Sequence, residues 1–209
     1  MNNSLVSSID LTEVNSQTFN YQFINILLNS SKNPNTTLED SLSAITSVNL
    51  TENEDSNNVL NLLRNVYLTN LTSLNLSNTI VTTTTINTIN VFNIIKLDLS
   101  NSCFSPNKHY VLDVLSILSS LRDLNLSDNS ITDKDFDKLL NLNLSSLDVS
   151  WNNLTEKSMY KLHQYYILPF ITRLNIRWNK IPLWSINNLS SHRKKIKILS
   201  SGNLENLCN

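Results

Sequence analysis

The clearest pattern in the chain is a spacing of apolar residues that recurs in the segment 121–154. It has the form Leu-x-x-Leu-x-Leu-x-x-Asn-x-Ile/Leu, occurs twice there, and occurs a third time over residues 171–181. Its alternating apolar positions predict a short strand with one buried face. The Asn that follows predicts a turn in which the amide both donates and accepts hydrogen bonds to turn backbone. The structural turn residues predicted in this way are Asn53, Asn129, Asn152 and Asn179.

The third apolar residue of each strand marks a repeat along the whole chain. These anchors are Leu11, Leu50, Leu76, Leu99, Leu126, Val149, Ile176 and Leu199. After Leu50 they lie 23 to 27 residues apart. Motif and spacing resemble the leucine-rich repeat family, in the general pattern of its intracellular, ribonuclease-inhibitor-like members. The resemblance implies an α/β solenoid, a short horseshoe with a parallel inner β-sheet of about eight strands and with helices and irregular segments on the convex side.

A single domain is expected over residues 1–209, with a degenerate N-terminal repeat or cap over 1–44 and the repeat array over 45–204. Apolar residues at helical spacing predict helices near 19–30, 57–67, 107–119, 133–140, 156–166 and 183–189. The segment 80–92 is rich in β-branched residues and poor in helix formers, so it predicts an extended or short 3₁₀ stretch. In the last unit Leu199 and Gly202 fit one register, whereas Ile196 and Ile198 fit a register shifted by one residue. The sequence therefore leaves two registers for the last strand.

Composition argues against catalysis. Gly202 is the only glycine, whereas loops that cradle phosphates need several. The three histidines, His109, His163 and His192, are dispersed, and Cys103 and Cys208 form no metal-ligand spacing and no disulfide framework. We therefore expect no enzyme, no cofactor and no metal site.

Two smaller features receive structural interpretations. Cys103 lies beside a turn and is predicted to be a buried thiol. The carboxylates of Asp133, Asp135 and Asp137 are predicted to be a solvated helix start, because the Gly and the closing Glu of a calcium loop are missing.

Charge and hydropathy indicate the cellular compartment and the kind of partner. The net charge is −1, so no global field favours nucleic acid or an anionic membrane. No signal peptide and no apolar run long enough to span a membrane is visible. These features favour a cytoplasmic protein, monomeric, with a protein partner rather than nucleic acid or a membrane.

A candidate binding site emerges where the outward strand positions depart from small polar residues. Its members are Trp151, Trp178, Arg173, Arg177, Asp148 and Asn175, from adjacent repeats on the expected inner face. Trp and Arg are the residues most enriched at interface hot spots. The alternative is structural: the two rings pack on each other or on the turn, and the Asp and Asn side chains form a ladder across the strands.

The leading hypothesis is a non-catalytic module that binds a protein on its inner, concave face. The resemblance implies such a surface, although a fold does not fix a function. Two alternatives remain: a substrate-recognition adaptor, for instance of a ubiquitin ligase, and a host-directed effector with an unrecognised activity.

Overall fold

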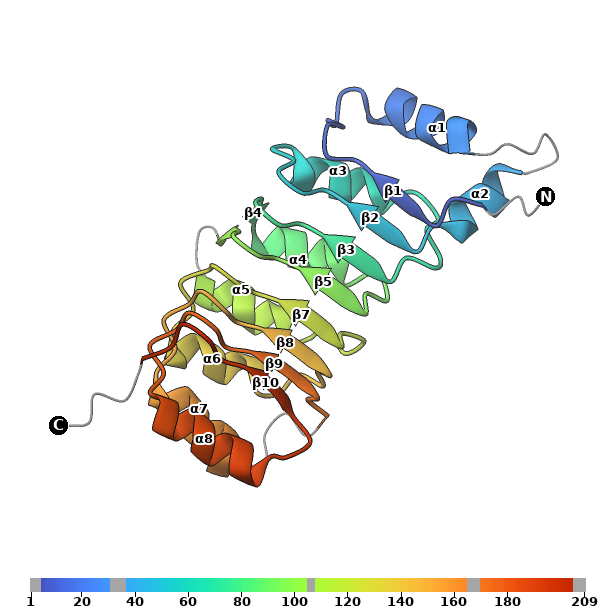
Figure 1. The fold of residues 1–209 in the computed structure, drawn as a ribbon. Helices are drawn as coiled ribbons and strands as arrows, with labels where there is room; N and C mark the ends of the chain where they lie inside the picture. Colours follow the sequence, from blue (N-terminus) through green and yellow to red (C-terminus); the bar gives the residue numbers. More distant parts are fainter. Residues whose placement is uncertain (1–4, 31–36, 105–107, 165–169, 205–209) are drawn as a thin grey trace.

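Eight short parallel strands form one sheet in the computed structural model, which describes residues 5–30, 37–104, 108–164 and 170–204 (Figure 1). In sheet order the strands are β1 (Ser8–Asp10), β2 (Ser47–Asn49), β3 (Ser73–Asn75), β5 (Lys96–Asp98), β7 (Asp123–Asn125), β8 (Ser146–Asp148), β9 (Arg173–Asn175) and β10 (Lys197–Leu199). Two further strands, β4 (Ile80–Val81) and β6 (Cys103–Phe104), pair with each other. Each neighbour in the large sheet belongs to the next repeat, so the sheet grows by one strand per unit.

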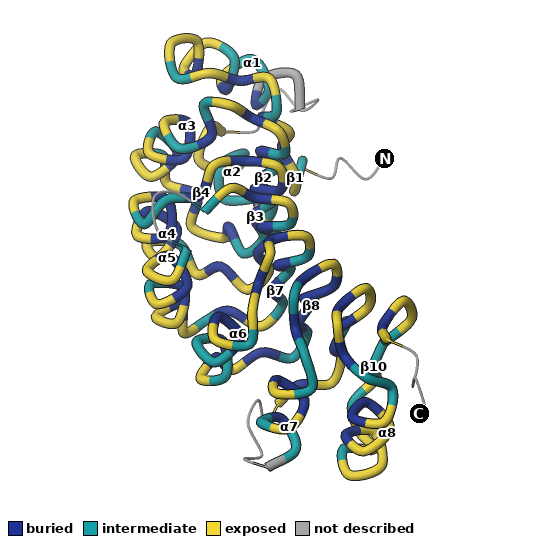
Figure 2. Tube along the Cα trace, turned by 90° about the vertical axis from the view of Figure 1, so that its left-hand side faces the viewer, coloured by how far each residue is buried: buried dark blue, intermediate teal, exposed yellow. Residues whose placement is uncertain are grey.

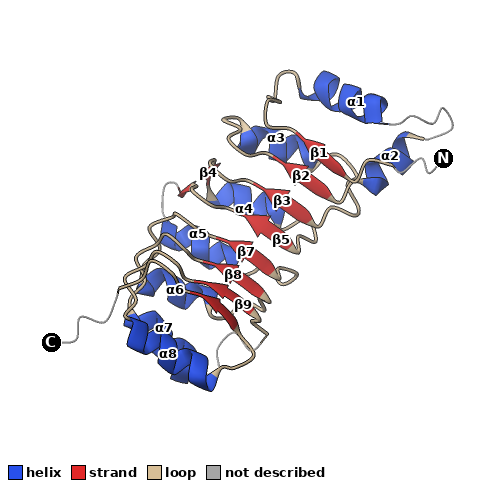
Figure 3. Cartoon of the chain, in the orientation of Figure 1, coloured by secondary structure: helices blue, strands red, loops and turns tan. Residues whose placement is uncertain are grey.

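The helices lie on the convex side of the solenoid, away from the inner face of the sheet (Figure 3). They are α1 (Phe19–Ser30), α2 (Leu38–Ala44), α3 (Ser56–Leu63), α4 (Thr83–Ile89), α5 (Lys108–Leu115), α6 (Asp133–Leu139), α7 (Glu156–Gln164) and α8 (Leu183–His192). Seen from the side, the units follow an arc with the helices on its outer edge (Figure 2). The predicted α/β solenoid is therefore confirmed.

The apolar positions of the repeat form one continuous core between sheet and helices. The second and third apolar residues of the strands, such as Leu124 and Leu126, are 3 % and 0 % exposed. The residue after each turn, for example Ile131 or Leu154, returns to this core and is also fully buried. Because each unit packs mainly on its neighbours, stability is expected to be a sum of nearest-neighbour contacts.

The third unit departs from the sequence prediction. Residues 83–89 form helix α4 rather than an extended or 3₁₀ segment, so that prediction was wrong. The side chains of Thr82 and Thr85 cap the helix reciprocally, and Thr88 donates to Asn61 of α3 over 2.8 Å. Ile86 and Ile89 are fully buried, so packing and capping outweigh the low helix propensity of Thr and Ile.

The last strand takes the alternative register. Ile198 pairs with Leu174, and Leu199 pairs with Asn175, so Leu199 is not the buried anchor that the repeat count assigned. Leu199 instead occupies the outward position filled by Asp or Asn in every other strand of the sheet, and it is half-buried. The shift also moves the turn residue of this unit from Gly202 to Asn203.

Other element boundaries agree with the sequence to within a few residues. Helix α1 has the predicted limits, whereas α2 was not anticipated. The predicted start of a helix at residue 107 and the end of another at residues 165–166 lie outside the described residues.

Candidate interaction surface

The buried turn residues hold neighbouring repeats together through hydrogen bonds to backbone groups. Asn152 donates through Nδ2 to the carbonyl oxygens of Leu126 and Ser150, over 2.9 and 3.0 Å. Its Oδ1 accepts from the backbone N–H groups of Asn129 and Ile131, over 3.0 and 2.7 Å. The side chain is 6 % exposed, so it satisfies four backbone groups that have little access to water.

The same arrangement recurs at the other turns. Asn53, Asn129, Asn179 and Asn203 each donate to backbone carbonyls of their own unit or the preceding one and accept from a backbone N–H. In the third and fourth units the hydroxyls of Thr79 and Ser102 replace the amide, and both donate to the carbonyl of Leu76.

The outward Asp and Asn side chains at the strand ends serve the fold. Asp148 accepts through Oδ1 from the backbone N–H and the hydroxyl of Ser150, over 2.9 and 2.6 Å. Its Oδ2 accepts from Nδ2 of Asn175 on the next strand over 2.6 Å. Asn125 donates to Asp98 in the same way. These side chains therefore close the turn after each strand and link strands in pairs, as the ladder interpretation predicted.

Trp151 and Trp178 occupy an unusual backbone position. The residue before each turn residue has a left-handed φ, and the other units place Glu52, Asn78, Asn101, Asp128 and Gly202 there. Trp151 and Trp178 have φ of 57° and 56°. A left-handed backbone costs a residue with a Cβ about 1–2 kcal/mol, and Asn or Asp tolerates it better than a bulky aromatic does.

The two indoles stack on each other. Their ring centroids are 4.8 Å apart and the planes differ by 18°, which matches the spacing of adjacent strands. The side chains nevertheless remain 57 % and 48 % exposed. The packing alternative is thus correct as far as the rings contact each other, but the stack is still open to solvent.

The only glycine of the chain completes the stack. Gly202 has φ of 74°, and a Cβ placed on it would lie 2.3 Å from Cδ2 of Trp178. Gly202 therefore supplies both the left-handed turn and the room for the indole. One face of Trp178 lies against Trp151 and the other against the Gly202 backbone.

Replacing Gly202 by Ala should displace Trp178. We expect a lower free energy of unfolding, by about 1 kcal/mol or more from the backbone alone, and a changed near-ultraviolet circular dichroism signal from the Trp pair. Ser201→Ala is the matched control, since Ser201 is exposed in the same turn. An unaltered dichroism spectrum for Gly202→Ala would contradict the stacking geometry.

The arginines differ in their surroundings. Arg173 lies 3.5 Å from Asp123, with its side chain 64 % exposed. Arg177 is exposed and has no ion pair among the described residues. A groove of about 470 Å³ runs over the inner face from β2 to β8 and includes Asp148 in its lining. Asp148 therefore lines that groove at its β8 end, whereas the other candidate residues lie on β9 or in the turns that follow β8 and β9.

Charge is distributed very unevenly, which the net value concealed. Residues 1–63 carry seven acidic and one basic side chain, a net charge of −6. Residues 151–209 carry two acidic and nine basic side chains, a net charge of +7. Counting charge by unit, instead of over the chain, would have revealed this asymmetry from the sequence.

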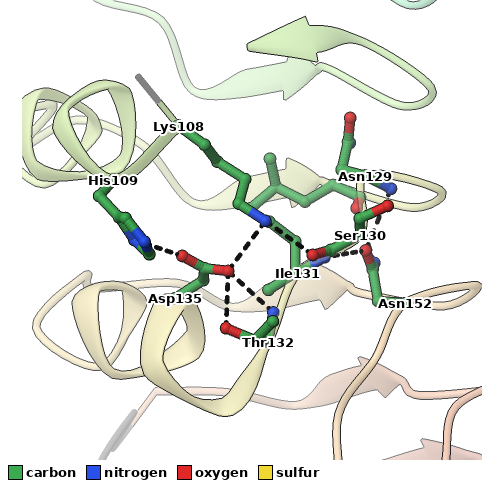
Figure 4. Close-up of polar contacts among 9 residues, drawn as sticks. Lys108, His109, Asn129, Ser130, Ile131, Thr132, Asp135 and Asn152 are labelled. Atoms are coloured by element: carbon green, nitrogen blue, oxygen red, sulfur yellow. Dashed lines mark hydrogen bonds and ion pairs between the residues drawn. The ribbon is translucent and has the colours of Figure 1, made fainter.

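Two side chains differ from their predicted surroundings. Cys103 is exposed, so the buried-thiol prediction was wrong. Asp135 is fully buried rather than solvated. Its carboxylate accepts from the N–H and hydroxyl of Thr132 and lies 3.0 Å from Nζ of Lys108 and 2.7 Å from Nδ1 of His109 (Figure 4).

These contacts outweigh the effect of burial on Asp135. Burial alone would raise the pKa of Asp135, but the hydrogen bonds from Thr132 and the Lys108 ammonium lower it below its ordinary value. Thr132 is the N-cap of α6, and Asp135 is the third residue of that helix. The cluster therefore joins α5 to α6.

A second groove lies on the convex side among α6, α7 and α8. Its volume is about 730 Å³, and Met159, Tyr160, Lys157 and Trp184 contribute to its lining. The sequence reasoning did not single it out. Across the described ranges, no cluster of three or more His, Cys, Asp or Glu side chains could hold a metal ion, and no helix is long and apolar enough to cross a membrane.

Comparisons with known proteins agree with this architecture. The family model described as Leucine Rich repeat matches residues 118–139 and 140–162. Among solved structures, TLR13 in its ssRNA13 complex shares 20 % identity over 95 % of this chain and 29 % of its own, with a TM-score of 0.55. Human 5T4, a trophoblast glycoprotein, shares 17 % over 78 % and 71 %, with a TM-score of 0.51.

An internalin from Listeria monocytogenes shares 20 % identity over 81 % of this chain and 46 % of its own, with a TM-score of 0.45. The chain thus spans less than half of the internalin and less than a third of TLR13. None of the curated proteins compared with the chain matches it in sequence. The repeated motif, the solenoid that it builds and the family model that matches residues 118–162 show that the chain folds as a leucine-rich repeat solenoid.

Proposed function

We propose that the protein is a non-catalytic interaction module that binds a protein partner on the inner face of its C-terminal units. The binding patch comprises Trp151, Trp178, Arg173, Arg177, Asp148 and Asn175. We also propose that residues 1–209 act as one domain, in the cytoplasm, where the widely spaced cysteines would stay reduced.

The observation that supports the patch best is the exposed Trp stack. Two left-handed Trp residues cost about 2 kcal/mol together or more, whereas an aromatic pair adds about 0.5–1.5 kcal/mol beyond its buried area. Backbone strain of this kind concentrates at ligand-binding sites. Arg177 precedes Trp178 in the chain, and its guanidinium has no ion pair among the described residues, so a large rigid surface and a hydrogen-bonding cation are presented together.

RNA is the competing kind of partner, because TLR13 is described in complex with ssRNA13. Base stacking needs an open aromatic face. Trp178 has Trp151 on one face and Gly202 on the other. The unit before Trp151 places Asp128 at the equivalent turn position, and its carboxylate would repel phosphate. The arrangement favours a protein surface.

The test is affinity capture with mass spectrometry from cells that express the protein. A stoichiometric partner should be retained by the wild type and lost with Arg177→Ala and with Trp178→Ala, each by about 2 kcal/mol or more of binding free energy. Tyr160→Ala is the control, because Tyr160 is 62 % exposed on the convex side. Normal binding by both patch variants, with loss of binding by Glu52→Ala, would contradict the assignment.

A further inference from the structure

Basic side chains line the last two strands of the inner face. Lys197 on β10 pairs in register with Arg173 on β9, so the two cations project side by side. Lys194 and Lys195 form the exposed turn that leads into β10. Arg177 follows β9 and is exposed at the opposite end of the strand.

Like charges on directly opposed strand residues repel each other. Asp123 lies on the far side of Arg173, at 3.5 Å, and is the only acidic partner that the described residues give to this group. A carboxylate placed between Lys197 and Arg173 would therefore remove a repulsion as well as form new ion pairs. The surface is thus complementary to negative charge.

An apolar spot interrupts this basic surface. Leu199 takes the outward position that Asn175 and Asp148 fill on the neighbouring strands, and it remains half-buried. Along the strand direction Arg173 and Arg177 are four residues apart, about 13 Å in extended chain. Leu199 lies between their levels, beside Asn175.

A long polyanion does not suit this surface. The adjoining strands carry Asp123 and Asp148 on the inner face, and residues 1–63 have a net charge of −6. A nucleic acid that continued along the sheet would meet these carboxylates. A short acidic segment would meet only the basic end.

We infer that the partner presents an extended acidic peptide segment, with an apolar side chain between its carboxylates, that lies along β9 and β10. The carboxylates pair with Lys197, Arg173 and Arg177, and the apolar side chain packs on Leu199. This inference rests on the proposed function, since it specifies the chemistry of the partner for the same surface.

The test uses defined peptides and fluorescence anisotropy. The probe is a fluorescein-labelled peptide of alternating Glu and Ser with a central Leu. Two comparison peptides replace the Leu by Ser or every Glu by Gln, and an oligouridine RNA represents nucleic acid. The wild type should bind the Leu-centred acidic peptide best, with an affinity that falls as salt rises.

Matched charge reversals locate the site. The double variant K195E/K197E should bind the acidic peptide at least about tenfold more weakly than the wild type. A tenfold loss of affinity is equivalent to about 1.4 kcal/mol. The control K134E/K157E makes the same charge change at exposed lysines of α6 and α7 on the convex side, and should bind within about twofold of wild type. Leu199→Ser should abolish the preference for Leu over Ser in the peptide.

The inference would be overturned by an absence of binding of the acidic peptide, by equal losses in both double variants, or by tighter binding of oligouridine. Self-association that K195E/K197E removes would also overturn it, because the occupant would then be the acidic N-terminal surface of a second copy. A captured partner could instead lose affinity for Trp178→Ala but bind K195E/K197E normally, with an affinity independent of salt. That result would refute this inference while leaving the proposed function intact.

Discussion

Replacing Asn152 by Leu should lower the free energy of unfolding by at least about 3 kcal/mol. Asn152 bonds to two carbonyl oxygens and two N–H groups, and its side chain is 6 % exposed. The Ser150 carbonyl also accepts from the Asp128 N–H, so the groups deprived of their partner are the Leu126 carbonyl and the N–H groups of Asn129 and Ile131. Leu has a similar size but no polar atoms, and each buried group left without a partner costs about 1–3 kcal/mol. Urea denaturation followed by far-ultraviolet circular dichroism measures the loss.

The adjacent residue provides a matched control for this substitution. Asn153 is half-buried and contributes a backbone N–H bond to the carbonyl of Ile131, which any residue can make. Asn153→Leu should therefore change stability by less than about 1 kcal/mol. Equal denaturation midpoints for the wild type and Asn152→Leu would show that the turn network contributes little to stability.

How much of this network was visible in the sequence depends on how regular each unit is. In the sixth unit, Leu144, Leu147, Val149 and Asn152 follow the motif, so strand, turn and core were all predictable. The motif works because burial, strand alternation and backbone satisfaction impose the same spacing. It says much less about the convex side, where many sequences can close the unit.

Helix α4 illustrates that limit. Its sequence, TTTINTI, has low helix propensity, and propensity alone predicted another structure. The reciprocal cap of Thr82 and Thr85 is local to this segment. The bond from Thr88 to Asn61 and the burial of Ile86 and Ile89, in contrast, depend on neighbouring repeats. No reading of residues 80–92 in isolation contains those contacts.

The last strand shows a second limit. Its alternation of Lys and Ile fits two registers, and only pairing with β9 selects between them. That choice places Leu199 outward and Asn203 in the turn, so the apolar spot on the basic surface could not be located before the structure. The contact between Trp151 and Trp178, in contrast, could be proposed from the sequence, because the two residues occupy equivalent positions in adjacent repeats.

Replacing Asp135 by Asn should destabilise the protein by about 3 kcal/mol, near the lower end for loss of one member of a buried ion pair. The carboxylate is fully buried and contacts Lys108, His109 and Thr132. The amide cannot pair with the Lys108 ammonium as a carboxylate does, although Lys108 and His109 retain some access to water, with side chains 25 % and 46 % exposed. Thermal and urea unfolding at neutral pH measure the loss.

The pH dependence of this loss of stability distinguishes an effect of the Asp135 charge from an effect of packing. Because the folded-state pKa of Asp135 is lowered, its ionised form contributes stability above the unfolded-state pKa of about 3.9, and that contribution is lost as pH falls through the folded-state pKa. The difference in unfolding free energy between wild type and Asp135→Asn should therefore be constant near neutral pH and shrink in acid. Asp113→Asn, which removes a carboxylate that is 53 % exposed and paired with Lys138, should cost less than about 1 kcal/mol at neutral pH. A difference for Asp135→Asn that stays the same down to acid pH would assign its effect to packing and not to the charge that joins α5 to α6.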